Sequence, residues 1–337
     1  MNLRRLTRAM LCGALALSAI SLRSPIPALA AGEKQLLIAE PQHGLGYLPL
    51  YVAIDNGYFK PLDVTTITLP SSASAHSDAV LTGKAWGFIG GPEHNAFADI
   101  KGANLRAIAN IVNRGNVYFV ARKGLTVPRG DLKNFIKGKT IAVSGYGGTP
   151  NSIARYFIDR LHLDPKKDVT LMEVTNPAIP AIMTQGKADI AVVSEPMLTK
   201  GVGEGIWQQP FYNAPKAFGP YAYSTINVSL STITGDPTTT RTFVAGMLKA
   251  LAFIRSNHDG AMAIAAKEFP DLSPPVLKGS MQRAYDDELW EWSGKITPGS
   301  VVTAESVVKT AGLLAVDVPY SEIVDLRFIN PKATGAR

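Results

Sequence analysis

Short apolar runs alternate with longer helical stretches along this chain, and this alternation restricts the fold more than any other feature. The first series predicts strands at residues 35–39, 64–69, 86–89 and 106–112, separated by helices at 48–56, 75–82 and 93–100. The second series predicts strands at residues 140–143, 169–174 and 189–193, with helices at 149–161 and 178–185. From Pro237 onward the pattern is almost entirely helical, with breaks near Pro270, Pro274 and Pro298. Such an order favours mostly parallel sheets covered by helices on both faces.

The first thirty residues are typical of a cleaved secretory signal peptide. Arg4, Arg5 and Arg8 precede an apolar run at residues 10–20 that is too short to span a bilayer comfortably. Ala28-Leu29-Ala30 then offers the small residues that a signal peptidase reads. We therefore expect residues 1–30 to be a signal peptide cleaved near Ala30 and the mature protein to be periplasmic; an uncleaved N-terminal anchor is the alternative.

The cysteine count and the charge exclude several classes of function. The only cysteine, Cys12, lies in the predicted signal peptide, so a mature chain has no disulfide, thiolate metal ligand or cysteine nucleophile. The whole chain carries a formal charge of +7, and residues 1–31 contain four arginines and no acid, which leaves +3 (7 − 4). This mild charge, spread without blocks, does not favour nucleic acid as a partner.

One internal similarity predicts two lobes built in the same way. Residues 79–85 lead through Gly-Lys-Ala into the strand at 86–89, and residues 182–188 lead through Gly-Lys-Ala into the strand at 189–193. Each strand is followed by a loop with an adjacent glutamate and proline, which are Pro92 with Glu93 and Glu195 with Pro196. Because glycine ends many helices, the shared order of elements carries this prediction rather than the three-residue match.

Three strand-to-helix junctions are rich in small residues and helix starters. They are residues 71–74, 90–92 and 144–150. In open α/β sheets ligands bind outside the carboxyl ends of the strands, where glycine permits close approach and free N–H groups favour acceptor atoms. The alternative is that these glycines serve turn geometry alone. The run at 144–150 matches neither a P-loop nor a dinucleotide-binding turn.

No catalytic constellation or metal-ligand spacing emerges from the sequence. The five histidines show no paired metal spacing, and there is no Gly-x-Ser-x-Gly motif. His43, His76 and His94 each fall in a candidate ligand loop, although a surface or hydrogen-bonding role is the alternative for each. We expect no cofactor, no metal and no enzymatic activity.

The order of segments resembles the substrate-binding proteins of the nitrate, sulfonate and taurine importers, a family grouped with the thiamine-pyrimidine synthase proteins. Residues 46–59, with Gly46-Tyr47-Leu48-Pro49 at their start and Asp55-Asn56-Gly57-Tyr58-Phe59 at their end, are similar to the opening helix of that family. Further similar segments are the start of the second lobe at 132–143, the Gly-Lys-Ala-Asp strand and acidic loop at 186–196, and the closing segments at 294–298 and 318–325. The resemblance covers nearly all of the mature chain.

This resemblance implies an α/β protein with the two-lobed periplasmic binding protein fold of type II, each lobe being a mixed, mostly parallel sheet flanked by helices. We expect a first lobe at 31–120, a second lobe at 121–221, and a return to the first lobe at 222–337. The crossings are expected near 117–122 and 222–230. Trp86 departs from the family pattern, which has Asp at this position, and we assign it to the core rather than to the cleft.

The ligand is expected in the cleft between the lobes. Glu93 and Glu195 favour a ligand with amine or hydroxyl donors, whereas the helix starts and Arg114 favour an anion; Glu93 alternatively serves only as a first-turn acid. The ligand therefore stays a small organic acid, a sulfonate or a nitrogen heterocycle. The candidate ligand-binding residues are His43, Gly44, Ser72, Ser74, Gly91, Glu93, His94, Asn116, Ser144, Tyr146, Gly147, Gly148, Thr149, Asn176 and Glu195.

The predicted function is the solute-binding component of an ABC importer. Closure of the two lobes about a hinge would present the loaded protein to an inner-membrane permease and its ATPase. We expect a monomer that binds a small molecule and no nucleic acid. The alternatives are an enzyme of the thiamine-pyrimidine-synthase-like fold and a sensory binding protein that serves a membrane receptor.

Overall fold

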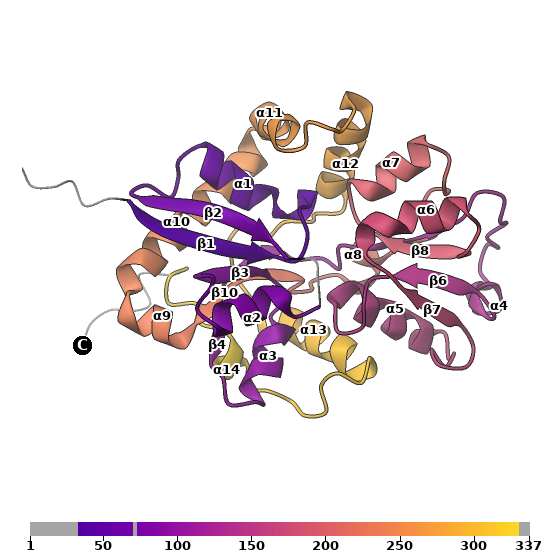
Figure 1. The fold of residues 1–337 in the computed structure, drawn as a ribbon, viewed down its shortest axis with the longest axis horizontal. Coiled ribbons are helices and arrows are strands. Elements are labelled where there is room, and N and C mark those ends of the chain that lie inside the picture. Colours follow the sequence, from indigo (N-terminus) through magenta and orange to yellow (C-terminus); the bar gives the residue numbers. More distant parts are fainter. Residues whose placement is uncertain (1–32, 70–72, 330–337) are drawn as a thin grey trace, which may run out of the picture. The chain divides into compact units, whose positions relative to one another are not determined.

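The computed structural model describes residues 33–69 and 73–329, so the predicted signal peptide lies outside the described residues. Within them the chain forms two five-stranded sheets flanked by helices (Figure 1). None of the helices described is long and apolar enough to cross a membrane.

The first sheet has the strand order β2-β1-β3-β10-β4. Strand β1 pairs in parallel with β2 and β3, whereas β10 runs antiparallel to β3 and β4, so that four strands share one direction. Helices α1 and α10 lie on one side of this sheet, and α2 and α3 lie on the other (Figure 1). The bounds are β1 Lys34–Glu40, β2 Leu62–Thr68, β3 Gly87–Gly90, β4 Leu105–Val112, β10 Ser224–Ser229, α1 Leu48–Asp55, α2 Ala75–Leu81, α3 Glu93–Asp99 and α10 Pro237–Ser256.

The second sheet repeats this plan with the order β7-β6-β8-β5-β9. Here β6 pairs in parallel with β7 and β8, and β5 is the one antiparallel strand. Helices α6 and α7 lie on one side and α5 on the other (Figure 1). The bounds are β5 Tyr118–Ala121, β6 Thr140–Val143, β7 Thr170–Glu173, β8 Ile190–Val193, β9 Tyr212–Asn213, α5 Thr149–Arg160, α6 Ile179–Thr184 and α7 Met197–Gly203. The predicted fold class is confirmed: there are two lobes, each with a mixed and mostly parallel sheet.

The two lobes exchange the chain next to their antiparallel strands. Residues 113–117 join β4 of the first sheet to β5 of the second, and residues 219–223 lead back into β10. The segments that we expected to cross, 117–122 and 222–230, are therefore occupied mainly by β5 and β10 themselves. The segments that link the lobes, residues 113–117 and 219–223, directly precede these two strands.

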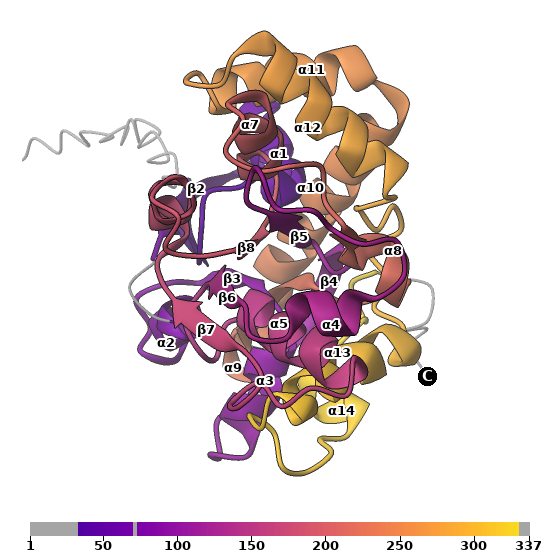
Figure 2. The same cartoon turned by 90° about the vertical axis from the view of Figure 1, so that its right-hand side faces the viewer.

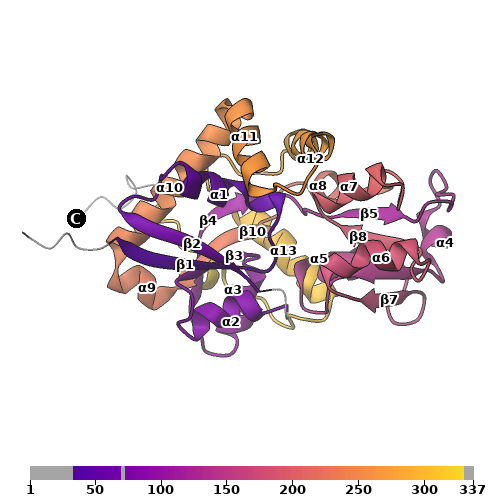
Figure 3. The same cartoon turned by 45° about the horizontal axis from the view of Figure 1, so that its top comes forward.

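The C-terminal helices do more than return to the first lobe. Helix α12 (Pro274–Asp286) packs on α7 of the second lobe as well as on α11 (His258–Glu268), and α13 (Pro298–Thr310) packs on both α5 and α3. Figure 3 places both helices beside the junction of the two sheets. The remaining elements are η1 Leu45–Tyr47, α4 Leu132–Ile136, η2 Asn176–Ala178, α8 Ala214–Phe218, α9 Leu230–Gly235 and α14 Tyr320–Ile323.

Alternation along β5 explains how one strand serves two helical layers. Tyr118 and Val120 belong to the buried cluster formed with α6 and α7, whereas Phe119 packs against Phe157 of α5 with ring centroids 4.5 Å apart. This period of two is the pattern of a strand covered on both faces. Trp86 is half-buried against Phe243 beside β3 and does not line the cavity described below, in agreement with its predicted place against the core.

Candidate functional site

A cavity of about 710 Å³ lies between the facing ends of the two sheets, a size suited to a small ligand. The first lobe contributes the segments that follow β1 and β3, and the second lobe contributes those that follow β6, β7 and β8. These are the carboxyl ends of parallel strands, where ligands collect in open α/β sheets. The candidate ligand loops after β3 and β6 adjoin this cavity, and their role in binding stays a prediction.

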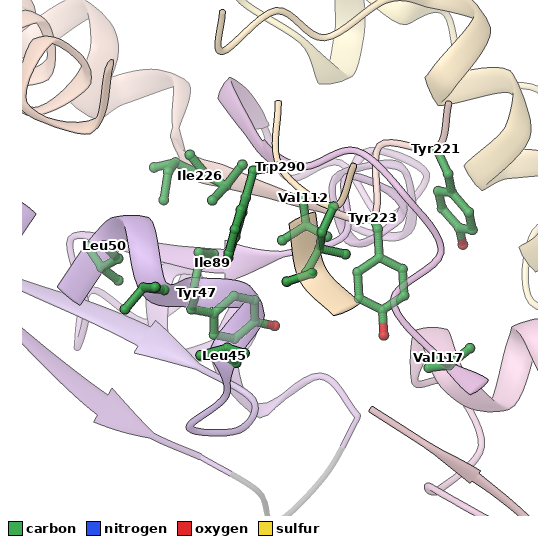
Figure 4. Close-up of a cluster of buried hydrophobic side chains, with 14 of the residues drawn as sticks. Leu45, Tyr47, Leu50, Ile89, Val112, Val117, Tyr221, Tyr223, Ile226 and Trp290 are labelled. Atoms are coloured by element: carbon green, nitrogen blue, oxygen red, sulfur yellow. The ribbon is translucent and has the colours of Figure 1, made fainter. Parts of the chain in front are cut away.

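Two tyrosines from the first lobe line the cavity and are fixed by the core behind them. Figure 4 shows Tyr47 and Tyr223 rising from a cluster of buried hydrophobic side chains that includes Ile226 and Trp290. The Trp290 Nε1–H donates to the carbonyl oxygen of Gly46 at 3.0 Å, which holds η1 in place. Both hydroxyl groups are thereby presented from rigid supports.

A pair of histidines forms the polar wall of the first lobe. His76 from α2 and His94 from α3 both line the cavity, with ring centroids 4.5 Å apart in an edge-to-face arrangement. Burial lowers the pKa of His94 to about 4 and holds the pKa of His76 well below its ordinary value, so both rings are neutral at neutral pH. A neutral imidazole offers one donor and one acceptor nitrogen. His76 is 2% exposed, and neither of its ring nitrogens has a hydrogen-bond partner among the described residues.

The glycine-rich loop before α5 supplies the facing wall of the second lobe. Gly147 has φ of +93°, a conformation that favours glycine, and Pro150 lies in the first turn of α5. The Asn151 side-chain amide donates to the Ser144 carbonyl oxygen at 2.8 Å and fixes the loop. The Ser144 hydroxyl oxygen is buried and has no partner in the part of the chain that the structure describes.

Glu93 lies directly behind this wall. Its Oε1 accepts a 2.5 Å hydrogen bond from the hydroxyl of Thr149 in the second lobe, and its Oε2 has no partner within residues 33–69 and 73–329. Burial raises the pKa of this carboxyl to about 7. A Cβ placed on Gly91 would lie 2.0 Å from Glu93 Oε2, so the carboxyl group occupies the space that a side chain at position 91 would need.

Glu195 lines the cavity but is fully engaged by its neighbours. Its Oε1 accepts from Arg283 Nε at 2.8 Å and from the Thr199 hydroxyl at 2.7 Å. Its Oε2 accepts from the Ser280 hydroxyl at 2.9 Å and from the Thr199 backbone N–H at 3.1 Å. Since Arg283 and Ser280 belong to α12, this carboxylate joins the cavity wall to a C-terminal helix rather than presenting a free negative charge.

The other carboxylates around the cavity are also paired. Glu173 accepts from Arg155 Nη2 at 3.1 Å, and Glu40 accepts from the Tyr51 hydroxyl at 2.6 Å. The hydrogen bond between His43 and Glu40 raises the pKa of His43. No lysine or arginine is found among the described residues that line the cavity. The lining is therefore polar and aromatic with little net charge.

The structure brings most of the predicted ligand residues together. Nine of the fifteen line the cavity: His43, Gly44, Gly91, His94, Ser144, Gly148, Thr149, Asn176 and Glu195.

The other six predicted residues lie elsewhere. Glu93 and Asn116 are buried behind the lining, with Asn116 packed near Gly46. Gly147 and Tyr146 belong to the loop before α5 but do not line the cavity, and the Tyr146 hydroxyl donates to the Ala311 carbonyl oxygen at 3.0 Å. Ser74 precedes α2 and donates to Asp78 instead, while Ser72 is outside the described residues.

Sequence reasoning missed several polar residues that line the cavity. They are Gln42, Thr68, Ser194, Tyr223 and Ser224, together with His76, which the sequence analysis placed in a candidate loop but left out of the list of candidate ligand-binding residues. Gln42 accepts from Asn176 Nδ2 at 2.6 Å and donates to the Ser194 hydroxyl at 3.5 Å, so it bonds across the cleft. Its position just after β1 follows the strand-end rule that located the other loops.

Among residues 33–69 and 73–329, no group of three or more histidine, cysteine, aspartate or glutamate side chains is placed to hold a metal ion.

A sequence profile described as NMT1/THI5 like matches residues 45–261, which is most of the described chain. The chain belongs to the NMT1/THI5-like family. The matched segment runs from η1 into α11, so it contains the elements that surround the cavity except β1 and the lining residues 41–44 that follow it. This membership confirms the resemblance found in the sequence.

Curated and solved relatives agree with the NMT1/THI5-like assignment. YtlA of Bacillus subtilis (strain 168), described as a binding protein, is 24% identical over 309 residues, which cover 86% of each chain. The alkanesulfonate-binding protein SsuA of Xanthomonas axonopodis pv. citri, solved with MOPS, has a TM-score of 0.71 at 16% identity and covers 88% of this chain and 100% of its own. The periplasmic aliphatic sulphonate binding protein SsuA of Escherichia coli has a TM-score of 0.65 at 16% identity, with 83% and 86% covered. At these identities the structural likeness establishes the fold.

Proposed function

We propose that this protein is the solute-binding component of an ABC importer and that it captures a small, uncharged nitrogen heterocycle in the cavity between its lobes. One observation carries the proposal: buried polar groups of His76 and Ser144 lack partners in the described chain, and both line the same cavity. A buried polar group without a partner costs about 1–3 kcal/mol, so such groups mark places where a ligand or water completes the bonding.

The charge of the lining is the reason for our choice among the three ligand classes that the sequence left open. A sulfonate or carboxylate keeps its negative charge at neutral pH and needs a compensating cation or several donors when it is buried. The described lining has no lysine or arginine, and the Glu93 carboxyl already contacts Thr149 at the start of α5. These features disfavour an anion and leave the nitrogen heterocycle as the best match.

The donors and acceptors also suit a flat heterocycle. His76 and His94 are neutral, and each supplies one donor and one acceptor from the first lobe. The Ser144 hydroxyl can donate or accept from the second lobe, and the aromatic rings of Tyr47 and Tyr223 provide flat apolar surface. A ring with adjacent nitrogen and amino groups, such as an aminopyrimidine, would satisfy both walls.

Hinge closure is the proposed means of capture. The Asn176 side-chain amide donates to Gln42, and the Thr149 hydroxyl donates to Glu93, so that two hydrogen bonds join the lobes beside the cavity. A ligand shifts such an equilibrium only by binding the closed form more tightly than the open form. The bonds between the lobes stabilise the closed form with or without ligand, whereas the ligand would prefer that form because only there can it contact His76 and Ser144 together.

The proposal extends to location and partners. Residues 1–30 would direct export and be removed, the mature monomer would work in the periplasm without catalysis, and a membrane permease with its ATPase would accept the ligand. Support comes from the family assignment and from the binding proteins that share the fold. The lobe boundaries near residues 120 and 221 stay a prediction.

A thermal-shift screen of the purified protein tests the ligand class. Pyrimidines and other uncharged heterocycles should raise the melting temperature with concentration, because a ligand bound only by the folded state stabilises it. Alkanesulfonates, nitrate and simple carboxylates should leave it unchanged. A shift with sulfonates or nitrate alone would overturn the heterocycle assignment.

A variant pair then tests the site. His76→Phe should weaken binding of the best heterocycle by at least about tenfold, because the buried donor and acceptor are removed. His258→Phe is the matched control, since His258 stacks on Tyr285 outside this cavity and should leave the affinity unchanged. Equal affinities of the two variants for the heterocycle would show that the ligand does not bind at the histidine pair.

A further inference from the structure

A row of cationic side chains lies at the end of the second sheet opposite the cavity. We call it the distal basic edge, and it comprises residues in three segments, 122–139, 166–167 and 187. Its members are Arg122, Lys123, Arg129, Lys133, Lys137, Lys139, Lys166, Lys167 and Lys187. In Figure 1, helix α4, which carries Lys133, lies at the end of this sheet away from the first sheet, and Figure 2 views the molecule from that end.

The strand order explains why these residues gather. Lys166 and Lys167 precede β7, Lys139 precedes β6, Lys187 precedes β8, and Lys123 follows the antiparallel β5. In the sheet order β7-β6-β8-β5, all four strand ends meet at one edge. Adjacent strands are about 4.8 Å apart, so the cations stand in a row roughly 15 Å long.

Most of these charges have no acidic partner. Within the described residues, Arg122 pairs with Asp189, Lys137 with Asp168 and Lys167 with Asp164. The other six cations form no ion pair there, and the undescribed residues contain no aspartate or glutamate. All six except Lys139 are exposed.

Charge also differs between the lobes. Residues 113–223 contain 14 lysines and arginines and 8 acids, which gives +6 (14 − 8). Residues 33–112 and 224–329 contain 14 lysines and arginines and 19 acids, which gives −5 (14 − 19). Fewer cations lie at the equivalent end of the first sheet. Lys34 there pairs with Asp236, and Lys60, Lys84 and Lys101 precede the other parallel strands without ion pairs among the described residues.

We propose that the distal basic edge docks on an anionic phospholipid surface. Positive charges near such a surface gain about 1 kcal/mol each, and a fluid headgroup layer requires no shape complementarity. A protein partner would instead be expected to find apolar or aromatic anchors. None of the large hydrophobic side chains exposed in the described chain lies within this edge, which favours lipid over protein.

The consequence is a defined orientation at the membrane. Because the cavity lies beyond the opposite ends of β6, β7 and β8, contact through the basic edge leaves the cavity residues free to bind ligand. The inference rests on the proposed location beside a membrane and not on the identity of the ligand. If the protein failed to dock on anionic membranes, the thermal-shift test of the ligand class would still hold.

Vesicle co-sedimentation of the purified protein tests the proposal. The probes are phosphatidylcholine vesicles with and without about one third phosphatidylglycerol. The protein should bind the anionic vesicles more tightly, and high salt should abolish the difference, since screening shortens the reach of surface charges to about 3 Å at 1 M. The triple variant Lys123→Glu, Lys166→Glu, Lys187→Glu should bind anionic vesicles at least about tenfold more weakly.

A second triple variant separates local charge from net charge. Lys84→Glu, Lys101→Glu, Lys249→Glu makes the same charge change at exposed first-lobe positions and should keep most of the binding. Equal losses in the two variants, or equal binding of the starting protein to both kinds of vesicle, would overturn the proposal. Capture by membranes that contain the permease but not by anionic vesicles would identify a protein partner and also overturn it.

Discussion

The carboxyl group of Glu93 in the first lobe accepts a 2.5 Å hydrogen bond from the hydroxyl of Thr149 in the second lobe. The contact lies just behind the cavity wall, where Glu93 is 1% exposed. A buried carboxyl in contact with one hydroxyl is costly to ionise, which is why burial raises its pKa to about 7. The bond between the lobes therefore includes a group that changes its charge near neutral pH.

Glu93→Gln should change how stability depends on pH. The folded pKa of about 7 lies above the ordinary value of 4.5, so the folded state binds more protons than the unfolded state between these values. The stabilising contribution of protonated Glu93 is present below about pH 4.5 and is lost as the pH rises through about 7. Glutamine has no charge to bury. As the pH rises from about 4.5 to about 7, the free energy of unfolding of the variant should therefore increase relative to that of the wild type by up to about 3 kcal/mol.

Urea unfolding of both proteins at pH 5 and pH 8 measures this difference. The variant should be the more stable of the two at pH 8, with the gap narrowing at pH 5. The same gap at both values would show that Glu93 does not titrate in this range.

Gly91→Ala should destabilise the fold because Glu93 fills the space beside it. The added Cβ would lie 2.0 Å from Glu93 Oε2, so the carboxyl must move and its bond to Thr149 must weaken. Overpacking of this kind costs about 1–3 kcal/mol. In a Glu93→Ala background the same change should cost much less, and such non-additivity is the measurable signature.

Gly145→Ala is the control for this glycine. An added Cβ there has no neighbour within 4 Å among the described residues, and the stability should change by less than about 0.5 kcal/mol. Equal losses for the two glycine variants would contradict the contact with Glu93.

Local pattern was sufficient to predict the strands β1 to β4 and β6 to β8, but it did not predict β5, β9 or β10. The strand expected at 140–143 is β6, and the helix expected at 149–161 is α5, which ends at Arg160. Such short elements were predictable because apolar runs ending in glycine or proline are a property of neighbouring residues. The same rule located the loops after β3, β6 and β8, and hence six of the nine predicted residues that line the cavity.

Contacts between distant segments could not be predicted in this way. Arg283 meets Glu195 from 88 residues away because α12 packs on α7, and no local pattern encodes that packing. His76 was noted as a histidine near a loop, but its burial without a partner follows from the position of α2 against β3. The distal basic edge is likewise invisible in sequence, where its lysines are dispersed, until the strand order brings them together.

Arg283→Gln should be costly because it leaves the Glu195 carboxylate without its cation. Glu195 is 3% exposed, and removing one partner of a buried ion pair costs about 3 kcal/mol or more. Arg283 is partly open to solvent, and Glu195 keeps three other hydrogen bonds. The loss of unfolding free energy should therefore stay near the lower end of that range, about 3 kcal/mol.

The matched control is Arg327→Gln. Arg327 pairs with Asp325 at a more exposed position, so its loss should cost less than about 1 kcal/mol. Chemical denaturation of the three proteins gives the comparison. Similar losses of stability in both variants would mean that the ion pair between Arg283 and Glu195 stabilises the fold no more than a surface ion pair does.

Ser144→Ala should separate ligand binding from stability. The Ser144 hydroxyl oxygen is buried beside the cavity and has no partner among the described residues, so its removal deletes an unsatisfied polar atom. Stability without ligand should stay the same or rise by up to about 1 kcal/mol, whereas affinity for the best heterocycle should fall by about 1 kcal/mol or more, roughly fivefold. Ser256→Ala, on the exposed side of α10, should change neither quantity by as much. Calorimetric titration and thermal unfolding of both variants measure the two effects, and a loss of stability with unchanged affinity would assign Ser144 to the fold rather than to the ligand.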